Sequence, residues 1–136
     1  MTIFVDTSVW SLAFRRDSAD GSPQVEFLLS ALAGNQLVVS TGLVLQELLQ
    51  GFNGANAELQ LLERFADLAF VIPSRETHVE AARLRNHCRG NGVQASTVDC
   101  VIAQLCIEND CDLLTVDQDF EHMARFSKLK VLAFKN

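Results

Sequence analysis

Short apolar segments alternate with longer helical patterns along the chain, and this alternation is the feature that most constrains the fold. Each apolar segment is too short for a helix and stops at a turn or capping residue, so each predicts a buried strand. Strands that are apolar throughout and separated by helices are typical of a parallel sheet covered by helices on both faces. The sequence therefore predicts an α/β protein, with strands at 3–5, 37–39, 70–72, 113–116 and 131–133.

Helix start and stop signals support this pattern. Pro23 suits the first turn of a helix that Gly34 ends, and Thr41 is positioned to cap the next helix. Helices are predicted directly after residue 6, from residue 23, directly after residue 41, over 55–66, 76–89 and 96–108, and from about residue 119. In the first three helices, the residues expected to face the core are Val9, Trp10, Leu12, Ala13, Val25, Leu28, Leu29, Leu32, Leu43, Val44, Leu45, Leu48 and Leu49. No repeat or linker divides the chain, so we expect one domain spanning 1–136.

The composition is that of an ordinary soluble globular protein. Hydrophobic residues make up 49% and charged residues 21% of the chain. We find neither a basic region leading into an apolar stretch nor a run long enough to span a membrane, so we expect a cytoplasmic location. The absence of a Cys-x-x-Cys pair favours buried reduced thiols over zinc ligands or disulfides. The cysteines are Cys88, Cys100, Cys106 and Cys111.

The net charge of −6 argues against tight, non-specific binding of nucleic acid, because proteins that bind it by charge alone are usually basic. A cluster of acids becomes much less negative once it binds divalent cations. An enzyme that acts on nucleic acid also needs only a local basic strip near its site. The arginines available for such a strip are Arg15, Arg16, Arg83, Arg85 and Arg89.

Four acids occupy places where a parallel sheet of this kind binds ligands, beyond the carboxyl ends of its strands. Asp6 and Asp117 each follow a predicted strand. Asp99 lies in the first turn of a predicted helix, and Glu47 borders the apolar stripe of another, where we expect partial desolvation. Three of the acids also have a purely structural interpretation. Asp6 and Asp117 suit helix N-caps, and Asp99 suits a capping box with Ser96.

Taken together, the acids indicate a metal site. Carboxylates gathered at one edge repel one another, and a hard divalent cation such as Mg²⁺ or Mn²⁺ relieves that repulsion. A metal-activated water can then attack a phosphodiester in line. No Ser-His-Asp or Cys-His arrangement competes, because the histidines lie on polar helical stretches. These are His78, His87 and His122.

The same residues resemble the PIN domain, and specifically the VapC-type toxins of bacterial toxin–antitoxin pairs. The opening segment 5–10, V-D-T-S-V-W, and the closing segment 114–120, L-T-V-D-Q-D-F, are fairly specific when they occur together. Between them, Glu47 lies in a mid-chain helix and Asp99 precedes Val101-Ile102-Ala103. The similarity covers nearly the whole chain and keeps the order and spacing of the family.

The resemblance implies a three-layer α/β/α fold with a five-stranded parallel sheet, and an endoribonuclease that depends on Mg²⁺ or Mn²⁺. It also implies a homodimer, and a cognate antitoxin that wraps the toxin and blocks its site. We expect RNA contacts from Arg15 and Arg16. The residues that could form a groove for the antitoxin are Trp10, Leu12 and Phe14. By resemblance, the metal-binding acids are Asp6, Asp99 and Asp117, with Glu47 as a further acid, Asp119 as either a ligand or an orienting residue, and Thr7 and Thr115 as supporting hydroxyls.

Two other functions fit the same fold class. A metal-dependent phosphatase of the haloacid-dehalogenase type needs a second Asp two positions after the first, where this chain has Ser8. A PIN-like module without catalysis would act as a binding partner or as a regulator of its own operon. Such a module does not need the acid set that this chain retains. Ser8 therefore argues against the phosphatase, and the intact acid set argues against the non-catalytic module.

Overall fold

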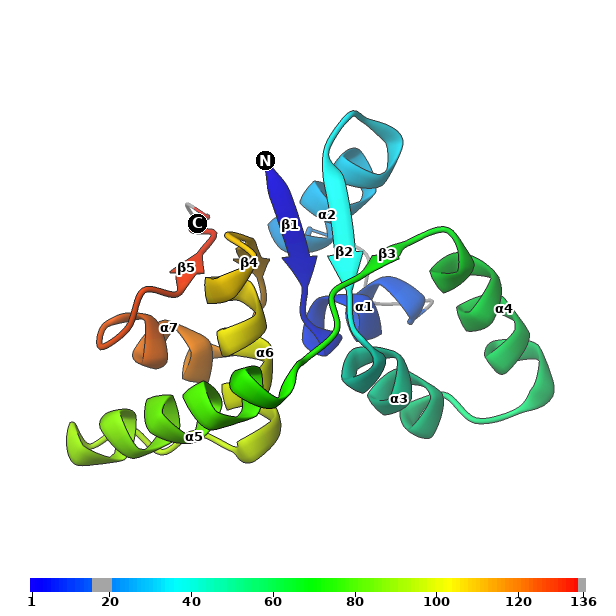
Figure 1. Cartoon of the computed structure of the whole chain (residues 1–136). Coiled ribbons are helices and arrows are strands. Elements are labelled where there is room, and N and C mark those ends of the chain that lie inside the picture. Colours follow the sequence, from blue (N-terminus) through cyan, green and yellow to red (C-terminus); the bar gives the residue numbers. More distant parts are fainter. Residues whose placement is uncertain (16–20, 135–136) are drawn as a thin grey trace.

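The computed structural model describes residues 1–15 and 21–134, which form a parallel sheet of five strands flanked by helices (Figure 1). The strand order is β3-β2-β1-β4-β5, so β1 lies at the centre. The strands are β1 (Thr2–Val5), β2 (Leu37–Ser40), β3 (Ala69–Phe70), β4 (Asp112–Leu114) and β5 (Lys130–Val131). All of the strand pairs are parallel, which confirms the predicted fold class.

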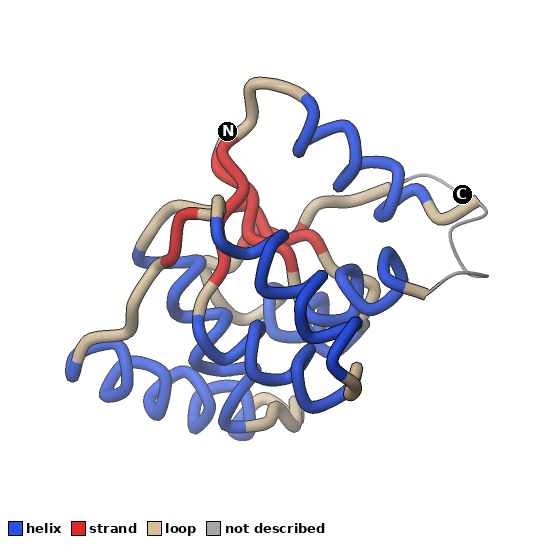
Figure 2. Tube along the Cα trace, turned by 90° about the vertical axis from the view of Figure 1, so that its right-hand side faces the viewer, coloured by secondary structure: helices blue, strands red, loops and turns tan. Residues whose placement is uncertain are grey.

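Helices cover both faces of the sheet and complete the predicted three-layer fold (Figure 2). The chain first runs outward from β1 to β3 and then returns to β4 and β5. Because parallel crossovers are right-handed, this reversal places the helices before β3 on one face and those after it on the other. The helices are α1 (Thr7–Phe14), α2 (Pro23–Ala33), α3 (Gly42–Gly51), α4 (Ala55–Ala66), α5 (Arg75–Gly90), α6 (Thr97–Glu108) and α7 (Gln118–Ala124).

Side-chain caps define several helix ends. Ser22 accepts a hydrogen bond from the backbone N–H of Val25 at 3.3 Å, directly before Pro23. Thr41 occupies the N-cap position of α3 as predicted, but its side chain makes no capping hydrogen bond. At the start of α5, Ser74 and Thr77 form a capping box that we had not predicted. These local contacts fix where the helices begin relative to the strand ends.

The two edge strands are shorter and earlier than predicted. β3 covers Ala69–Phe70 instead of 70–72, and β5 covers Lys130–Val131 instead of 131–133. Ile72 is 80% exposed, since the chain has already left the sheet there. β4 ends at Leu114, two residues before the predicted end. An apolar run marks a strand well, but pairing with a neighbour decides where the strand stops.

The core lies around β1, whose Ile3, Phe4 and Val5 side chains are completely buried. All four cysteines are buried and free of disulfides, and the three histidines are exposed, as the sequence predicted. Leu29, which we expected in the core, is instead 54% exposed. Within the described ranges, no helix is both long and apolar enough to cross a membrane.

Neighbouring leucines on α2 provide a test of this core. Leu28 is fully buried, whereas Leu29 is 54% exposed. We expect Leu28→Ala to lower the free energy of unfolding by about 2–5 kcal/mol, because it removes buried methyl groups and leaves a cavity. The matched change Leu29→Ala should cost no more than about 0.5 kcal/mol. Urea unfolding followed by circular dichroism measures both values. Equal losses would show that α2 packs with a different face toward the sheet.

Candidate metal centre

Asp6 lies where the central strand leaves the sheet. β1 pairs with β4 in a register that matches Val5 with Leu114, and the backbone N–H of Asp6 donates to the Leu114 carbonyl at 2.9 Å. β1 and β4 flank the point where the strand order reverses, which is where open α/β sheets bind ligands. The residues that follow the two strands therefore meet at one edge.

Hydrogen bonds fix the carboxylate of Asp6, which is only 5% exposed. The Ser8 hydroxyl donates to Oδ2 at 2.7 Å and the Thr115 hydroxyl donates to the same oxygen at 2.9 Å. The backbone N–H of Ser8 also reaches Oδ2, at 3.3 Å, so Asp6 is the N-cap of α1. Burial raises the pKa of Asp6, while the hydrogen bonds from Ser8 and Thr115 act in the opposite direction.

Asp117 caps α7 beside Asp6. Its backbone N–H donates to the Thr115 hydroxyl at 3.0 Å, so Thr115 contacts both strand-end acids. Its Oδ1 accepts a hydrogen bond from the backbone N–H of Asp119 at 3.0 Å. That turn brings the exposed Asp119 carboxylate close to Asp117.

Asp99 enters the same cluster from the first turn of α6. Its backbone N–H donates to the Ser96 hydroxyl at 3.0 Å, which is the helix-capping half of the predicted box. The carboxylate lies instead among the other acids. One ligand oxygen from each of Asp99, Asp117 and Asp119 lies within 4.8 Å of the others. The structure thus brings Asp99 and Asp117 together and adds Asp119 to them.

The pKa of Asp99 is affected by its burial and by the acids around it. Burial is the largest cause that raises its pKa, to about 6 from an ordinary 3.8. The negative charge of Asp6 raises it further, as do those of Asp117 and Glu47, against a hydrogen bond with Ser96. Asp6 and Glu47 lie outside the three-acid group, yet their charges act on it. The carboxylates of this site therefore repel one another.

Glu47 stands on α3, which follows β2. It is exposed, so the predicted partial desolvation is wrong. The Thr7 hydroxyl donates to its Oε1 at 2.7 Å, which ties α3 to the start of α1. Both hydroxyls named from the family resemblance thus contact the acids: Thr7 contacts Glu47, and Thr115 contacts Asp6 and the backbone of Asp117.

Ser8 is the residue of this site that we did not single out from the sequence. Its hydroxyl donates to Asp6, lies 3.2 Å from the Thr115 hydroxyl and accepts from the backbone N–H of Val116 at 3.2 Å. It therefore connects the two strand ends directly. A hydroxyl two residues after a strand-end Asp is the signal that could have identified it, because a side chain in the first helical turn can reach back to the cap.

The predicted RNA contacts are not part of this cluster. Arg15 is exposed at the C-terminal end of α1, whereas Asp6 caps the other end of this helix, which is about 12 Å long. Arg16 lies outside the described residues. Among the residues that the structure describes, neither predicted RNA-binding arginine therefore contacts the acids.

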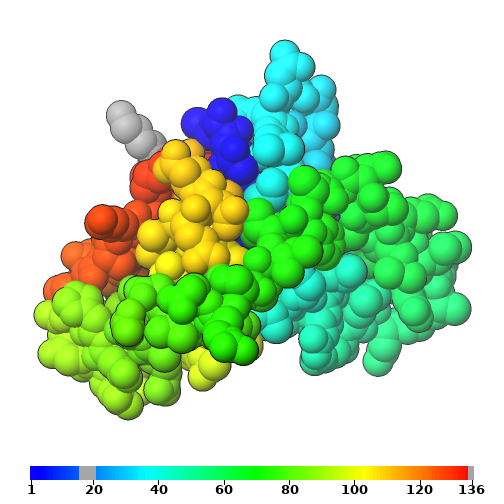
Figure 3. All heavy atoms as spheres, viewed as in Figure 1, coloured from blue at the N-terminus to red at the C-terminus, as the bar shows by residue number. Residues whose placement is uncertain are grey.

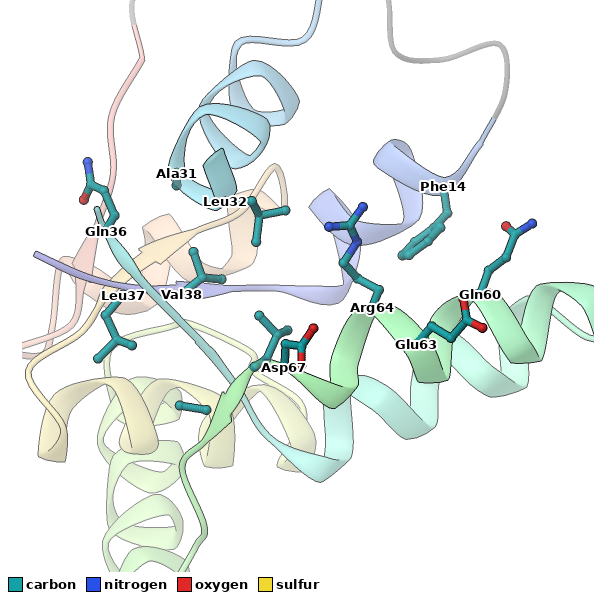
Figure 4. Close-up of a pocket in the computed structure, with 12 residues that line it drawn as sticks. Phe14, Ala31, Leu32, Gln36, Leu37, Val38, Gln60, Glu63, Arg64 and Asp67 are labelled. Carbon is teal, nitrogen blue, oxygen red and sulfur yellow. The ribbon is translucent and has the colours of Figure 1, made fainter. Parts of the chain in front are cut away.

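A groove of about 790 Å³ opens away from the acids, between α2, α4 and the start of β2 (Figure 4). Phe14 and Leu32 supply apolar walls, and Arg64 on α4 points into the space (Figure 4). Trp10, which we had assigned to such a groove, is instead core: it is 1% exposed and its ring lies 4.9 Å from that of Phe65. The groove is lined by Phe14, Ala31, Leu32, Gln36, Leu37, Val38, Gln60, Glu63, Arg64, Asp67, Leu68 and Ala69.

The sequence matches the PIN domain family over residues 3–126, and the chain belongs to this family. The family assigned from the residues is thereby confirmed. Solved structures, toxin–antitoxin proteins among them, share the fold over almost the full length of this chain. They are only distantly related in sequence, so the similarity concerns the fold.

Three of these structures show how similar the folds are and how low the sequence identity is. VapBC2 from Rickettsia felis, bound to a DNA fragment from its promoter, has a TM-score of 0.77 at 19% identity, covering 99% of this chain and 100% of that one. FitAcB from Neisseria gonorrhoeae has a TM-score of 0.73 at 18% identity, covering 96% of each chain. VapC20 from Mycobacterium tuberculosis, a toxin that cleaves the sarcin–ricin loop, has a TM-score of 0.69 at 22% identity, covering 93% and 98%.

The raised pKa of Asp99 predicts how stability depends on pH. The folded protein keeps this proton up to a pH of about 6, whereas the unfolded chain releases it near 3.8. The metal-free protein should therefore lose stability as the pH rises through this window. Asp99→Asn removes the charge, so we expect it to stabilise the metal-free protein above pH 6, by on the order of 1 kcal/mol after solvent screening, and to have little effect near pH 4.

Urea unfolding in EDTA at both pH values measures this difference. Asp110→Asn is the matched control at the opposite end of β4. The Lys130 ammonium donates a hydrogen bond to Asp110 and lowers its pKa, so this control should lose stability at neutral pH. An Asp99→Asn gain of the same size at pH 4 would contradict the electrostatic explanation.

Proposed function

We propose that this chain is the toxin of a type II toxin–antitoxin pair, acting as an endoribonuclease that requires Mg²⁺ or Mn²⁺. The observation that carries the proposal is the convergence of the Asp99, Asp117 and Asp119 carboxylates, beside the buried Asp6, at the switch point of a PIN fold. In this proposal one PIN domain spans 1–136, works as a homodimer and acts in the cytoplasm.

The residues present fit a hard divalent cation. The donors are carboxylate oxygens, which Mg²⁺ and Mn²⁺ prefer, and no cysteine or histidine belongs to the cluster found among the described residues. Burial raises the pKa of Asp99 and the charges of Asp6, Asp117 and Glu47 raise it further, a repulsion that a bound cation would relieve. In the proposed site Asp6, Asp99 and Asp117 hold the metal, with Glu47 and Asp119 as further acids. When bound, the metal would make a water molecule more acidic and stabilise the leaving oxygen of a phosphodiester.

The chain's own contribution is to hold the acids in place before substrate arrives. Thr115 and Ser8 fix the Asp6 carboxylate, and Thr7 fixes Glu47. Thr7 and Ser8 lie in the first turn of α1 and Thr115 directly follows β4, and backbone hydrogen bonds join these two places. Such preorganisation lets the acids meet a cation without a costly rearrangement.

RNA as the substrate and an antitoxin as the partner are supported by the family and by what its structural relatives do. VapC20 is a toxin that cleaves the sarcin–ricin loop, and VapBC-5 from Mycobacterium tuberculosis is a member of the VapBC family of toxin–antitoxin systems. In our proposal the antitoxin occupies the groove beside Phe14 and Leu32. The charges of Glu63, Arg64 and Asp67, which line the groove, suit a partner segment that is apolar on one face and charged on the other.

Cleavage of a labelled RNA by the purified protein tests the nuclease directly. We expect cleavage with Mg²⁺ or Mn²⁺ and none in EDTA. Asp6→Asn should lower the rate by more than about 100-fold, the upper end of what loss of an outer-shell contact costs a metal site. Asp110→Asn, an equivalent change far from the cluster, should leave the rate unaltered. Cleavage that persists in EDTA, or equally in Asp6→Asn, would rule out the metal-dependent mechanism, whereas a complete lack of cleavage would favour the non-catalytic module.

Expression in a bacterial host tests the biological role. We expect the chain alone to arrest growth, because unrestrained RNA cleavage stops translation. Asp99→Asn should relieve the arrest at equal protein levels, and co-expression of a small DNA-binding protein encoded upstream should relieve it for the unaltered chain. Growth curves with immunoblots measure both effects. Arrest that is unchanged by Asp99→Asn would contradict the toxin assignment.

A further inference from the structure

Helix α5 has a net positive charge although the protein as a whole is acidic. This helix carries four arginines and only two glutamates, in a chain whose net charge is −6. Arg83 is paired with Glu80 at 2.6 Å. The other three arginines, Arg75, Arg85 and Arg89, take part in none of the ion pairs formed by the described residues. α5 therefore presents positive charge that no carboxylate of the described structure neutralises.

A cavity of about 240 Å³ lies between α5 and α6 next to Arg85. Its polar walls are the side chains of Arg85, Asn86, His78 and Thr97, all of which can donate hydrogen bonds. No aspartate or glutamate is among its lining residues, although the chain contains 17 of them. A small hollow with an arginine, several donors and no acid is suited to an anion.

The cavity lies at the same end of α6 as the acid cluster. The arrowheads of β1 and β2 point toward the region where α5 lies, and α5 is uncovered on the face seen in Figure 3 (Figures 1 and 3). Thr97 and Cys100, which line the cavity, flank Asp99 in the first turn of α6. The cavity and the cluster are thus neighbours across the start of one helix.

Arg85 is held in place for this role. Its Nε donates to the Ala95 carbonyl at 3.0 Å, just before α6 begins. This bond leaves the two terminal nitrogens of the guanidinium for other acceptors. The planar fork of an arginine recognises phosphate by paired hydrogen bonds, which a lysine in its place would not provide.

We propose that the cavity between α5 and α6 binds a backbone phosphate of the RNA substrate, with Arg85 as its principal contact. This subsite rests on the proposed ribonuclease function. It would let an acidic enzyme bind the RNA backbone at one positively charged point, beside the acids that act on the scissile bond. Arg85 is a substrate-positioning residue in this arrangement, and it replaces Arg15 and Arg16 as the main RNA contact.

The test compares steady-state cleavage of a fluorescein-labelled single-stranded RNA of mixed sequence at several salt concentrations. Arg85→Gln should raise KM about 10-fold with little change in kcat, as expected for loss of one charge-assisted hydrogen bond. The slope of log(kcat/KM) against log[salt] should become shallower by about 0.7, the contribution of one phosphate on a single strand. Arg83→Gln, on the same helix but outside the cavity, should change KM less than about 2-fold.

A second pair of variants covers the case in which Arg85→Gln weakens folding. Ala82 is exposed and lines the cavity, so Ala82→Glu adds a negative charge there without removing any contact. Ala82→Gln is its neutral counterpart of equal size. We expect Ala82→Glu to raise KM about 10-fold relative to Ala82→Gln, because a like charge repels the phosphate.

The outcomes separate this subsite from the nuclease proposal. If the unaltered chain does not cleave RNA, the proposed function fails first. If it does cleave, equal KM values for Ala82→Glu and Ala82→Gln would overturn the phosphate subsite. Unchanged kinetics with weaker antitoxin binding, or with an altered oligomeric state on gel filtration, would assign the cavity to a protein partner and also overturn it.

Discussion

The pairing of β1 with β4 is the contact on which the candidate site depends. It places Asp6 directly beside Thr115, through the bond from the Asp6 N–H to the Leu114 carbonyl at 2.9 Å. Thr115 then donates to Asp6 and accepts from the backbone of Asp117, so one hydroxyl joins two acids that are far apart in the sequence. Without this parallel pair at the reversal of strand order, the strand-end acids would lie at separate places on the surface.

The acids lower the stability of the metal-free fold that gathers them. Burial and neighbouring charges raise the pKa of Asp99 to about 6, which means that the folded protein holds it ionised only at a cost near neutral pH. A core built around the completely buried Ile3, Phe4 and Val5 of β1, together with capped helices such as α5, can tolerate that cost. In the proposed site, a divalent cation that binds the folded state and relieves this repulsion would also stabilise the fold. The affinity that we propose for the cation and the lower stability without it would then have the same origin.

Much of the fold could be predicted from the sequence, because the apolar strands and the helix caps are local signals. The central strands and the order of the acids followed from those signals together with the rule that parallel strands end at one edge. What failed depended on non-local packing. The ends of β3 and β5 are set by pairing at the sheet edges, and the exposure of Leu29 is set by how α2 rests on the sheet. Ser8 was missed because its importance lies in contacts to residues more than a hundred positions away.

Capping and metal binding are compatible roles for the same carboxylates. A carboxylate has two oxygens, and capping uses only part of its capacity to accept hydrogen bonds. Asp6 caps α1 through Oδ2, and Asp117 caps α7 through Oδ1. In each case the cap fixes the side-chain orientation, which is what a preorganised ligand requires. Asparagine is as good an N-cap as aspartate. An Asp→Asn change at either position should therefore keep the helix start and remove only the charge, which separates the role of these residues in folding from their role in chemistry.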